Sequence, residues 1–482
     1  MKTLKNKIML DIAFLLALIF KVTSYGSSYF PVLDDYIQYG GYPLYESLSH
    51  VYLKIGTIAT RPFASILDPA VWGTFYPNML IPLLIITVLF FFAAKLIAST
   101  LEKLKIFITP FLYAILLICP LGFEGTYWLS ASSRICVGLF FTGLALSFLI
   151  KLIEKKKKIW LVPYVLSTLL SFGFYESVMI VSALLQFFVI VTLLKSNKKR
   201  LLYLITPLLC GVLMLLYYKL FGNIGALGSR ANGFSFENLG QNTIALFSQF
   251  FEILIKGGIL TTAKGALSGT KLMCESLSGL IRLLIIVLIS LLCAYFSKNE
   301  EFKAPKKCIL FGIALTFLPL APNVLTTDVW LTYRSVVPCF IGLVLLSAPL
   351  FVKIFKKTTV RFTVIFAIIL IFMCANVNEL DTYRRVHETD SALVTEICEQ
   401  LDDDVLSGEK ETIVVLKEEI ITPQVSYYKD HVKSVFSSDW ALTGAIRAKC
   451  RNVKIKMVTP VYSKDEILTD DKQIIYIGGN YE

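Results

Sequence analysis

Long uninterrupted apolar runs constrain this sequence more than any other feature. They occupy residues 8–27, 76–98, 106–122, 135–152, 159–174, 177–194, 201–221, 277–297, 308–325, 336–352 and 360–377. A run of about 18 apolar residues is long enough to cross roughly 30 Å of hydrocarbon as a helix. The chain is 56% apolar and 17% charged, whereas a soluble domain is about 25% charged. We therefore expect an all-α polytopic membrane protein with about eleven transmembrane helices.

The net charge of +12 resides largely in short connections between these runs. Basic residues precede the first run and follow the second, fourth, sixth, eighth and tenth runs. Examples are Lys7, Lys103, Lys105, Lys155, Lys156, Lys199, Arg200, Lys306, Lys307, Lys356 and Lys357. Since positively charged connections stay in the cytoplasm, we predict a multi-pass cell-membrane protein with a cytoplasmic N-terminus and an extracytoplasmic C-terminus. The same rule explains the positive charge without a nucleic-acid partner.

The first run resembles a signal peptide, because lysines precede its apolar stretch. No clear small-x-small cleavage site follows, however, and Lys21 lies late in the run. We interpret residues 8–27 as a retained first helix.

The predicted outer face carries most of the polar sequence. A transmembrane domain over 1–377 bears two outer loops, 28–75 and 222–276, and residues 378–482 form a small extracytoplasmic α/β domain. Within this tail, patterns predict helices at 382–401 and 439–449 and strands at 412–416, 453–458 and 473–477. Cys398 and Cys450 also lie in the tail, and the sequence leaves their pairing open.

The adjacent acids Asp34 and Asp35 are the most informative polar motif. They lie a few residues beyond the first helix. Neighbouring carboxylates repel each other, which raises the pKa of one of them and makes it a usable general base. The alternative is that the pair caps the following helix and faces water.

Other outer turns repeat a combination of acids, arginines and aromatics. The residues are Arg61, Glu124, Tyr127, Trp128, Arg134, Glu176, Asp328 and Arg334. Singly, each has a structural explanation as an interfacial aromatic, a snorkelling arginine or an ion-pair partner. Together they predict a cavity that binds a lipid phosphate through arginine and a sugar ring through aromatics, because arginine matches phosphate oxygens bidentately. An amphipathic stretch from Tyr45 to Ile58 lies in the first loop.

This pattern resembles the GT-C membrane glycosyltransferases. The features that carry the resemblance are Asp34-Asp35 after the first helix, Arg61-Pro62 in the same loop, many spans and an extracytoplasmic C-terminal domain. Within that class, residues 34–63 resemble the bacterial polytopic glucosyltransferases of O-antigen and other surface glycans. The resemblance implies a polyprenyl-phosphate sugar donor, a glycan or lipid-linked acceptor, and transfer with inversion on the outer face. It gives the base role to Asp35 or Asp34 and the lipid-phosphate role to Arg134 or Arg334.

Two other function classes stay open at this stage. A transporter or flippase of lipid-linked glycans would carry polar groups at mid-span, which are scarce here. A membrane scaffold would use the tail to bind a partner. No GxGxxG or Walker A motif predicts a nucleotide cofactor, and a divalent metal that bridges Asp34 or Asp35 and the phosphate is an open alternative. The sequence specifies neither the sugar nor the acceptor.

Overall fold

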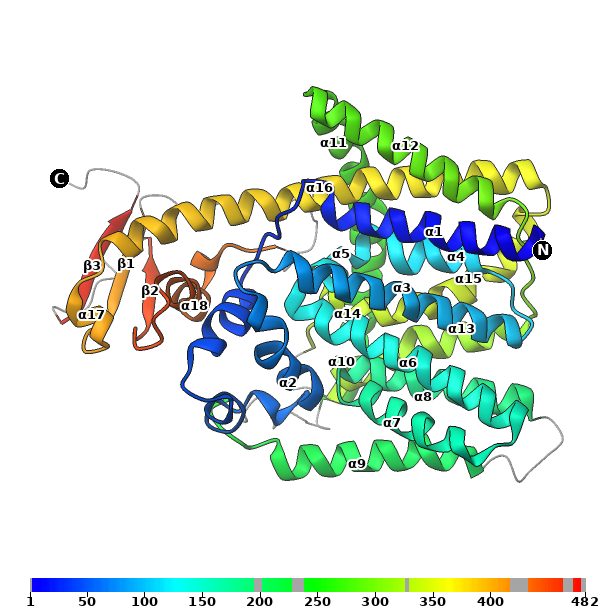
Figure 1. The fold of residues 1–482 in the computed structure, drawn as a ribbon, viewed down its shortest axis with the longest axis horizontal. Helices are drawn as coiled ribbons and strands as arrows, with labels where there is room; N and C mark the ends of the chain where they lie inside the picture. The colour runs from blue at the N-terminus through cyan, green and yellow to red at the C-terminus, as the bar shows by residue number, and fades with distance from the viewer. Residues whose placement is uncertain are drawn as a thin grey trace.

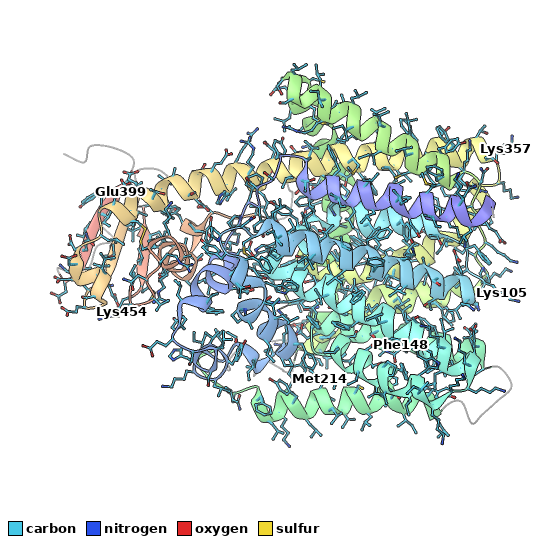
Figure 2. All side chains as sticks on the ribbon, in the orientation of Figure 1. Lys105, Phe148, Met214, Lys357, Glu399 and Lys454 are labelled. Carbon is cyan, nitrogen blue, oxygen red and sulfur yellow. A yellow bond between two sulfur atoms is a disulfide. The ribbon has the colours of Figure 1, made fainter. Side chains whose placement is uncertain are left out.

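The fold has two parts, a bundle of long helices and a smaller tail at one end of the bundle (Figure 1). They are seen in a computed structural model that describes residues 2–194, 202–227, 238–325, 329–416, 432–462 and 471–477. We call the end of the bundle that carries the tail the tail end. Lys105 and Lys357, from two of the basic connections, lie at the end opposite Glu399 and Lys454 of the tail (Figure 2).

The axes of most bundle helices are roughly aligned with one another (Figure 1). Their bounds are α1 (Lys2–Thr23), α3 (Leu80–Lys103), α6 (Leu129–Lys155), α7 (Leu161–Phe172), α8 (Glu176–Leu193), α9 (Ile205–Phe221), α12 (Leu277–Ser297), α13 (Lys307–Phe317), α15 (Phe340–Ile354) and α16 (Thr358–Glu399). Except for the first turns of α1 and the second half of α16, their sequences are mostly apolar all round, as expected of helices that pack on one side and face lipid on the other. The structure thus confirms a mostly helical fold of membrane type.

The predicted count of about eleven spans is higher than the number of described helices that are long and apolar enough to cross a membrane. In the described part of the chain, nine helices are long and apolar enough to cross a membrane, or ten if one bent pair counts as a span. Eight of the nine coincide with predicted runs, and the bent pair, Thr109–Ile118 with Pro120–Tyr127, covers the run at 106–122. The runs at 8–27 and 159–174 do form helices. However, α1 contains Lys7, Asp11 and Lys21, and the other helical stretch is short, at Lys158–Phe172.

The one spanning-length stretch that matches no predicted run is Leu239–Cys274. It lies where the sequence predicted an outer loop at 222–276, so that prediction is wrong over these residues. The stretch comprises α10 (Leu239–Glu252), the π-helical segment η11 (Ile253–Thr261) and α11 (Thr262–Cys274). In Figure 1, α11 lies at the upper edge of the bundle beside α12 and α10 lies near its middle, so the stretch runs across the direction of the long helices. Frequent Gly, Thr and Ser residues obscured its apolar character in the sequence.

The bend in the α4–α5 pair explains the buried lysine of α1. The pair is α4 (Thr109–Tyr113) with η6 (Ala114–Ile118), then η7 (Pro120–Gly122) with α5 (Phe123–Tyr127), and the two halves meet at 49°. The bend frees backbone carbonyls, which must find donors inside an apolar bundle. Lys21 Nζ donates to Leu117 O at 3.1 Å, and Asn376 Nδ2 donates to Ile118 O at 2.7 Å. Lys21 therefore stabilises a broken helix.

The first loop folds into a chain of short helices. They are η1 (Tyr36–Gly41), η2 (Tyr42–Leu44), η3 (His50–Ile55), η4 (Thr57–Ala59), α2 (Pro62–Ala70) and η5 (Trp72–Phe75). The predicted amphipathic stretch at 45–58 is therefore not one continuous helix, since Gly56 adopts a positive φ of 85° between η3 and η4.

The tail is a small α/β unit. Three parallel strands, β1 (Thr412–Leu416), β2 (Val458–Val461) and β3 (Gln473–Ile477), are ordered β2-β1-β3, with α17 (Asp403–Ser407) and α18 (Asp439–Cys450) alongside. Two predicted strands and both predicted helices are confirmed, the first helix as the end of α16. The strand predicted at 453–458 is displaced: β2 begins at Val458, and Ile455 O before it accepts two hydrogen bonds from the Arg447 guanidinium. Cys398 and Cys450 form a disulfide.

The tail is fixed to the bundle by a continuous helix and by the first loop. Helix α16 has 42 residues, so it passes through the predicted boundary at 377 without a break and carries the chain into the tail. Helix α18 packs on η1 at two glycines: a Cβ on Gly444 would overlap the Ile37 side chain, and a Cβ on Gly40 would overlap Ala448. Tyr36 belongs to the hydrophobic core of the tail.

Candidate functional site

The paired acids separate because the chain turns sharply just before them. Leu33 adopts a φ of +44°, which is rare for a residue with a side chain. The turn is closed by a backbone hydrogen bond of 3.0 Å from Asp35 N to Val32 O. Such an outlier is retained only where the surroundings enforce it. Here it accompanies two neighbouring carboxylates with different surroundings.

Asp35 lies inside the protein with both oxygens occupied. Its Oδ1 accepts hydrogen bonds from the Ser130 backbone at 3.0 Å and hydroxyl at 2.6 Å. Its Oδ2 accepts one from the Tyr29 hydroxyl and one from Val32 N at 3.3 Å. Burial raises the pKa of Asp35 to about 7. This carboxyl holds the first loop against the start of α6.

Asp34 has the opposite surroundings. Its side chain is partly exposed and lines a cavity of about 1500 Å³. It forms no hydrogen bond or ion pair with any residue in the described part of the chain. Of the two predicted acids, Asp34 alone lines the cavity. Asp35 could hold the metal of that alternative only by giving up these hydrogen bonds, so Asp34 is the acid that could join a metal to the phosphate.

The cavity lies between the first loop, the tail and the tail-end termini of several helices. Its walls come from η1, η3, η4 and α2, from α6, α8 and α9, from η12 (Leu318–Leu325) after α13, and from α18. Its charged lining residues in the described ranges are Asp34, Arg61, Asp68, Arg134, Glu176, Lys219 and Arg447. The structure therefore gathers four predicted site residues here, namely Asp34, Arg61, Arg134 and Glu176.

Asp68 is a cavity residue that the sequence did not single out. It is buried near the end of α2, where its Oδ2 lies 3.6 Å from Arg134 Nη2. The Tyr39 hydroxyl lies within donating distance of both Asp68 Oδ1, at 3.2 Å, and Ser133 Oγ, at 3.3 Å. Burial raises the pKa of the Asp68 carboxyl, although the Arg134 charge opposes that rise. The only sequence signal was a lone acid in an otherwise apolar helix.

Arg134 and Lys219 are the two cavity cations whose side chains donate no hydrogen bond to any described residue. Arg134 Nε is buried without an acceptor in the described part of the chain. Lys219 is exposed on α9 and forms no ion pair with any described residue. By contrast, Arg61 Nε donates to both Glu176 oxygens, at 3.0 and 3.1 Å, and its guanidinium lies 4.6 Å from the Tyr175 ring centre.

The remaining predicted residues form a second cluster that does not line the cavity. Glu124 is buried, with its Oε1 3.5 Å from Arg334 Nη1, and the Arg334 guanidinium lies 4.6 Å from the Trp128 ring centre. Trp128 Nε1 donates to Val32 O at 3.3 Å, and the Tyr127 hydroxyl accepts from Phe30 N at 3.0 Å. We call these four residues, Glu124, Tyr127, Trp128 and Arg334, the Glu124 cluster. Asp328 lies outside the described residues.

Comparisons with protein-family models, curated proteins and solved structures find no match for this chain. Its chemistry has to be inferred from the cavity itself. An unengaged carboxylate, a buried guanidinium with a free N–H and a second cation line one chamber. Such a set can accept a proton and hold an anion side by side.

Proposed function

We propose that this chain is a multi-pass membrane glycosyltransferase of GT-C type. It would move a sugar from a polyprenyl-phosphate donor to a cell-surface glycan or lipid-linked acceptor. The observation that carries the proposal is the cavity that brings together Asp34, which has no partner among described residues, and Arg134, which has a buried free donor. Sugar transfer from a lipid phosphate needs a base and an anion-binding group, and little else.

Two observations support placing the cavity on the outer face. The basic connections that contain Lys105 and Lys357 lie at the end of the bundle away from the tail (Figure 2), and positive connections are cytoplasmic. The tail also contains the Cys398–Cys450 disulfide, and stable disulfides are typical of oxidising compartments. On this orientation the tail and the cavity are extracytoplasmic.

The donor would enter from the membrane side of the cavity. Ile180 of α8 and Leu215 of α9 line that side, and α9 exposes apolar side chains such as Leu208. The polyprenyl chain can lie along this apolar wall while its phosphate reaches Arg134 and Lys219. Of the two arginines that the sequence proposed for the phosphate, the cavity favours Arg134, since Arg334 does not line it.

Asp34 would act as the general base. The acceptor hydroxyl gives its proton to the Asp34 carboxylate while its oxygen bonds to the anomeric carbon. The bond from that carbon to the phosphate oxygen breaks, and the phosphate leaves with the electron pair and is held by Arg134. Attack from the face opposite the phosphate inverts the anomeric configuration. Positioned base catalysis contributes about 10²–10⁴-fold, and a donor aimed at developing negative charge about 10²–10³-fold.

Incorporation of radiolabelled sugar tests the proposal. Membranes that carry the wild type, Asp34→Asn or Asp402→Asn are given a panel of labelled polyprenyl-phosphate sugars. Asp402 is the matched control, because it is an exposed acid at the start of α17 in the tail. We expect transfer by the wild type and Asp402→Asn, and a loss of at least 100-fold in Asp34→Asn at equal protein level.

Two other outcomes have defined meanings. Equal transfer by Asp34→Asn would remove Asp34 as the base and make Asp68, the other cavity-lining aspartate, the next residue to test. Absence of transfer from every donor by well-expressed wild type would overturn the enzyme proposal and leave the fold unaffected.

A further inference from the structure

The tail contributes a wall of the cavity through one face of α18. Trp440, Thr443, Gly444 and Arg447 all line the cavity, and their spacing of three and four residues places them on one side of a helix. Met457, just before β2, lines the same wall. None of these residues was suggested by the sequence, because their position depends on how the tail packs against the first loop.

Within this wall, Trp440 is the residue whose polar side-chain group has no hydrogen-bond partner in the described ranges. Thr443 Oγ1 accepts a hydrogen bond from Val458 N at 2.9 Å, and the Arg447 guanidinium donates twice to Ile455 O. Trp440, in contrast, is 47% exposed, and it has no ring contact or hydrogen bond with any residue in the described ranges. An exposed tryptophan with a free N–H offers an apolar face and a polar edge to a ligand.

The backbone of α18, which carries Trp440, is held firmly by its surroundings. Glycines at the α18–η1 contact allow close packing, since a Cβ on Gly444 would overlap Ile37. Arg451 Nη1 donates to Gly40 O at 3.4 Å, and the disulfide at Cys450 ties the end of α18 to α16. A helix fixed in this way loses little backbone entropy when a ligand binds to its side chains.

We infer that the α18 face around Trp440 is the binding site for the saccharide chain of the acceptor. This inference rests on the proposed function. The donor's lipid chain would restrict it to the wall formed by α8 and α9. In Figure 1, α18 lies beyond the tail-end termini of α6, α8 and α9, so a saccharide would reach this wall from outside the spanning part of the bundle. A sugar ring would place its C–H face on the indole while a hydroxyl accepts from Nε1. Tyr45 lines the same cavity from the first loop.

Equilibrium binding of a glycan tests the inference directly. The probe is the surface glycan purified from cells that lack this gene and labelled with a fluorophore, because that glycan carries unmodified acceptor positions. Purified protein in lipid nanodiscs is compared as wild type, Trp440→Ala and Trp440→Phe. Trp330→Ala is the matched control, since Trp330 is 59% exposed and does not line the cavity.

We expect Trp440→Ala to raise the Kd about 3- to 10-fold, in line with about 0.5–1.5 kcal/mol for an aromatic contact. Trp440→Phe should recover most of the affinity by restoring a stacking face, and Trp330→Ala should stay within twofold of wild type. In the transfer assay, Trp440→Ala should raise the apparent KM for the glycan and leave the KM for the donor unchanged. Unfolding temperatures of all variants exclude a folding defect.

The binding and transfer readouts separate the inference from the proposed function. If wild type binds the glycan through Trp440 but transfers nothing, the glycosyltransferase proposal fails and the saccharide site stands. If wild type transfers sugar and Trp440→Ala binds and transfers as wild type does, the proposed function stands and this inference is overturned. Lack of glycan binding by wild type also overturns it.

Discussion

The residues around Arg134 and the Glu124 cluster are of the same kinds, but only those around Arg134 line the cavity. Each pairs a buried acid with an arginine: Asp68 lies 3.6 Å from Arg134, and Glu124 lies 3.5 Å from Arg334. Arg134 lines the cavity and has an Nε–H without an acceptor in the described chain. Arg334 has the more exposed side chain, 33% against 18%, but it lies over the Trp128 ring and does not line the cavity. An ion pair on a cavity wall can exchange its partner for a ligand held in that cavity.

Asp34 and Asp35 repeat this contrast at neighbouring positions. The Leu33 turn leaves Asp34 in the cavity and places Asp35 among donors from Tyr29, Val32 and Ser130. The difference suggests a division of labour, in which the cavity-lining members act on substrate and the others hold the surrounding segments in place.

The two arginines should differ most in sugar transfer. We expect Arg134→Gln to lower transfer about 10²–10³-fold, because the departing phosphate loses a preorganised donor. Arg334→Gln should lower transfer by less than tenfold at equal amounts of folded protein. Labelled transfer by purified protein in nanodiscs measures both variants. A larger loss in Arg334→Gln than in Arg134→Gln would reverse the assignment of the phosphate site.

The two neighbouring acids should differ in stability. Asp35→Ala leaves the buried donors of Ser130 and Tyr29 without an acceptor, so we expect the free energy of unfolding to fall by about 2–4 kcal/mol. Asp34→Ala removes no hydrogen bond within the described chain and should change it by less than about 0.5 kcal/mol. Unfolding in mixed detergent micelles measures both. Equal stability losses would mean that Asp34 also supports the loop.

The pH dependence of stability sharpens the role of Asp35. Its folded pKa of about 7 lies above the unfolded value of 3.8. Between these values the folded protein retains a proton that the unfolded chain releases, so the free energy of unfolding falls as pH rises. One such group contributes at most about 1.4 kcal/mol for each pH unit. Asp390, whose pKa burial raises to about 6, contributes with the same sign.

The comparison with Asp35→Asn isolates this contribution, since the amide does not titrate and Asp390 is present in both proteins. Unfolding is measured from pH 4.5 to 7.5. We expect the wild type to lose stability relative to Asp35→Asn across that range. Parallel profiles would show that the Asp35 carboxyl is already charged in the folded protein at the lower pH.

The fold was largely predictable because apolar length is a local property. Eight of the nine spanning-length helices in the described chain match predicted runs. The crosswise stretch at Leu239–Cys274 was missed, since Gly and Thr residues interrupt its apolar pattern. The continuity of α16 was also missed, because composition changes near residue 377 while the backbone hydrogen bonds of the helix continue.

The site was predictable only by residue type. Sequence patterns proposed Arg134 and Arg334 on equal grounds, and only tertiary packing decides which one lines a cavity. Asp68 carries no motif, and it became visible through its position beside Arg134. Trp440 lies more than 300 residues after Asp68 and Arg134 in the sequence, and it reaches the cavity only because α18 packs on η1. No single position in the sequence indicates whether its side chain lines a cavity or which distant residues lie beside it.

The smallest expected difference between the cavity and the Glu124 cluster is the one between their acids, Asp68 and Glu124. Asp68 holds Arg134 from within the cavity, so we expect Asp68→Asn to lower transfer about tenfold by loosening the guanidinium, with Asp68→Glu recovering part of the loss. The effect should fall on the KM for the donor, because a displaced Arg134 binds the phosphate less well. Glu124→Gln should leave the donor KM unchanged and lower the unfolding temperature instead. If Asp68→Asn abolishes kcat with an unchanged donor KM, Asp68 acts on the proton of the acceptor, and the base role moves to it from Asp34.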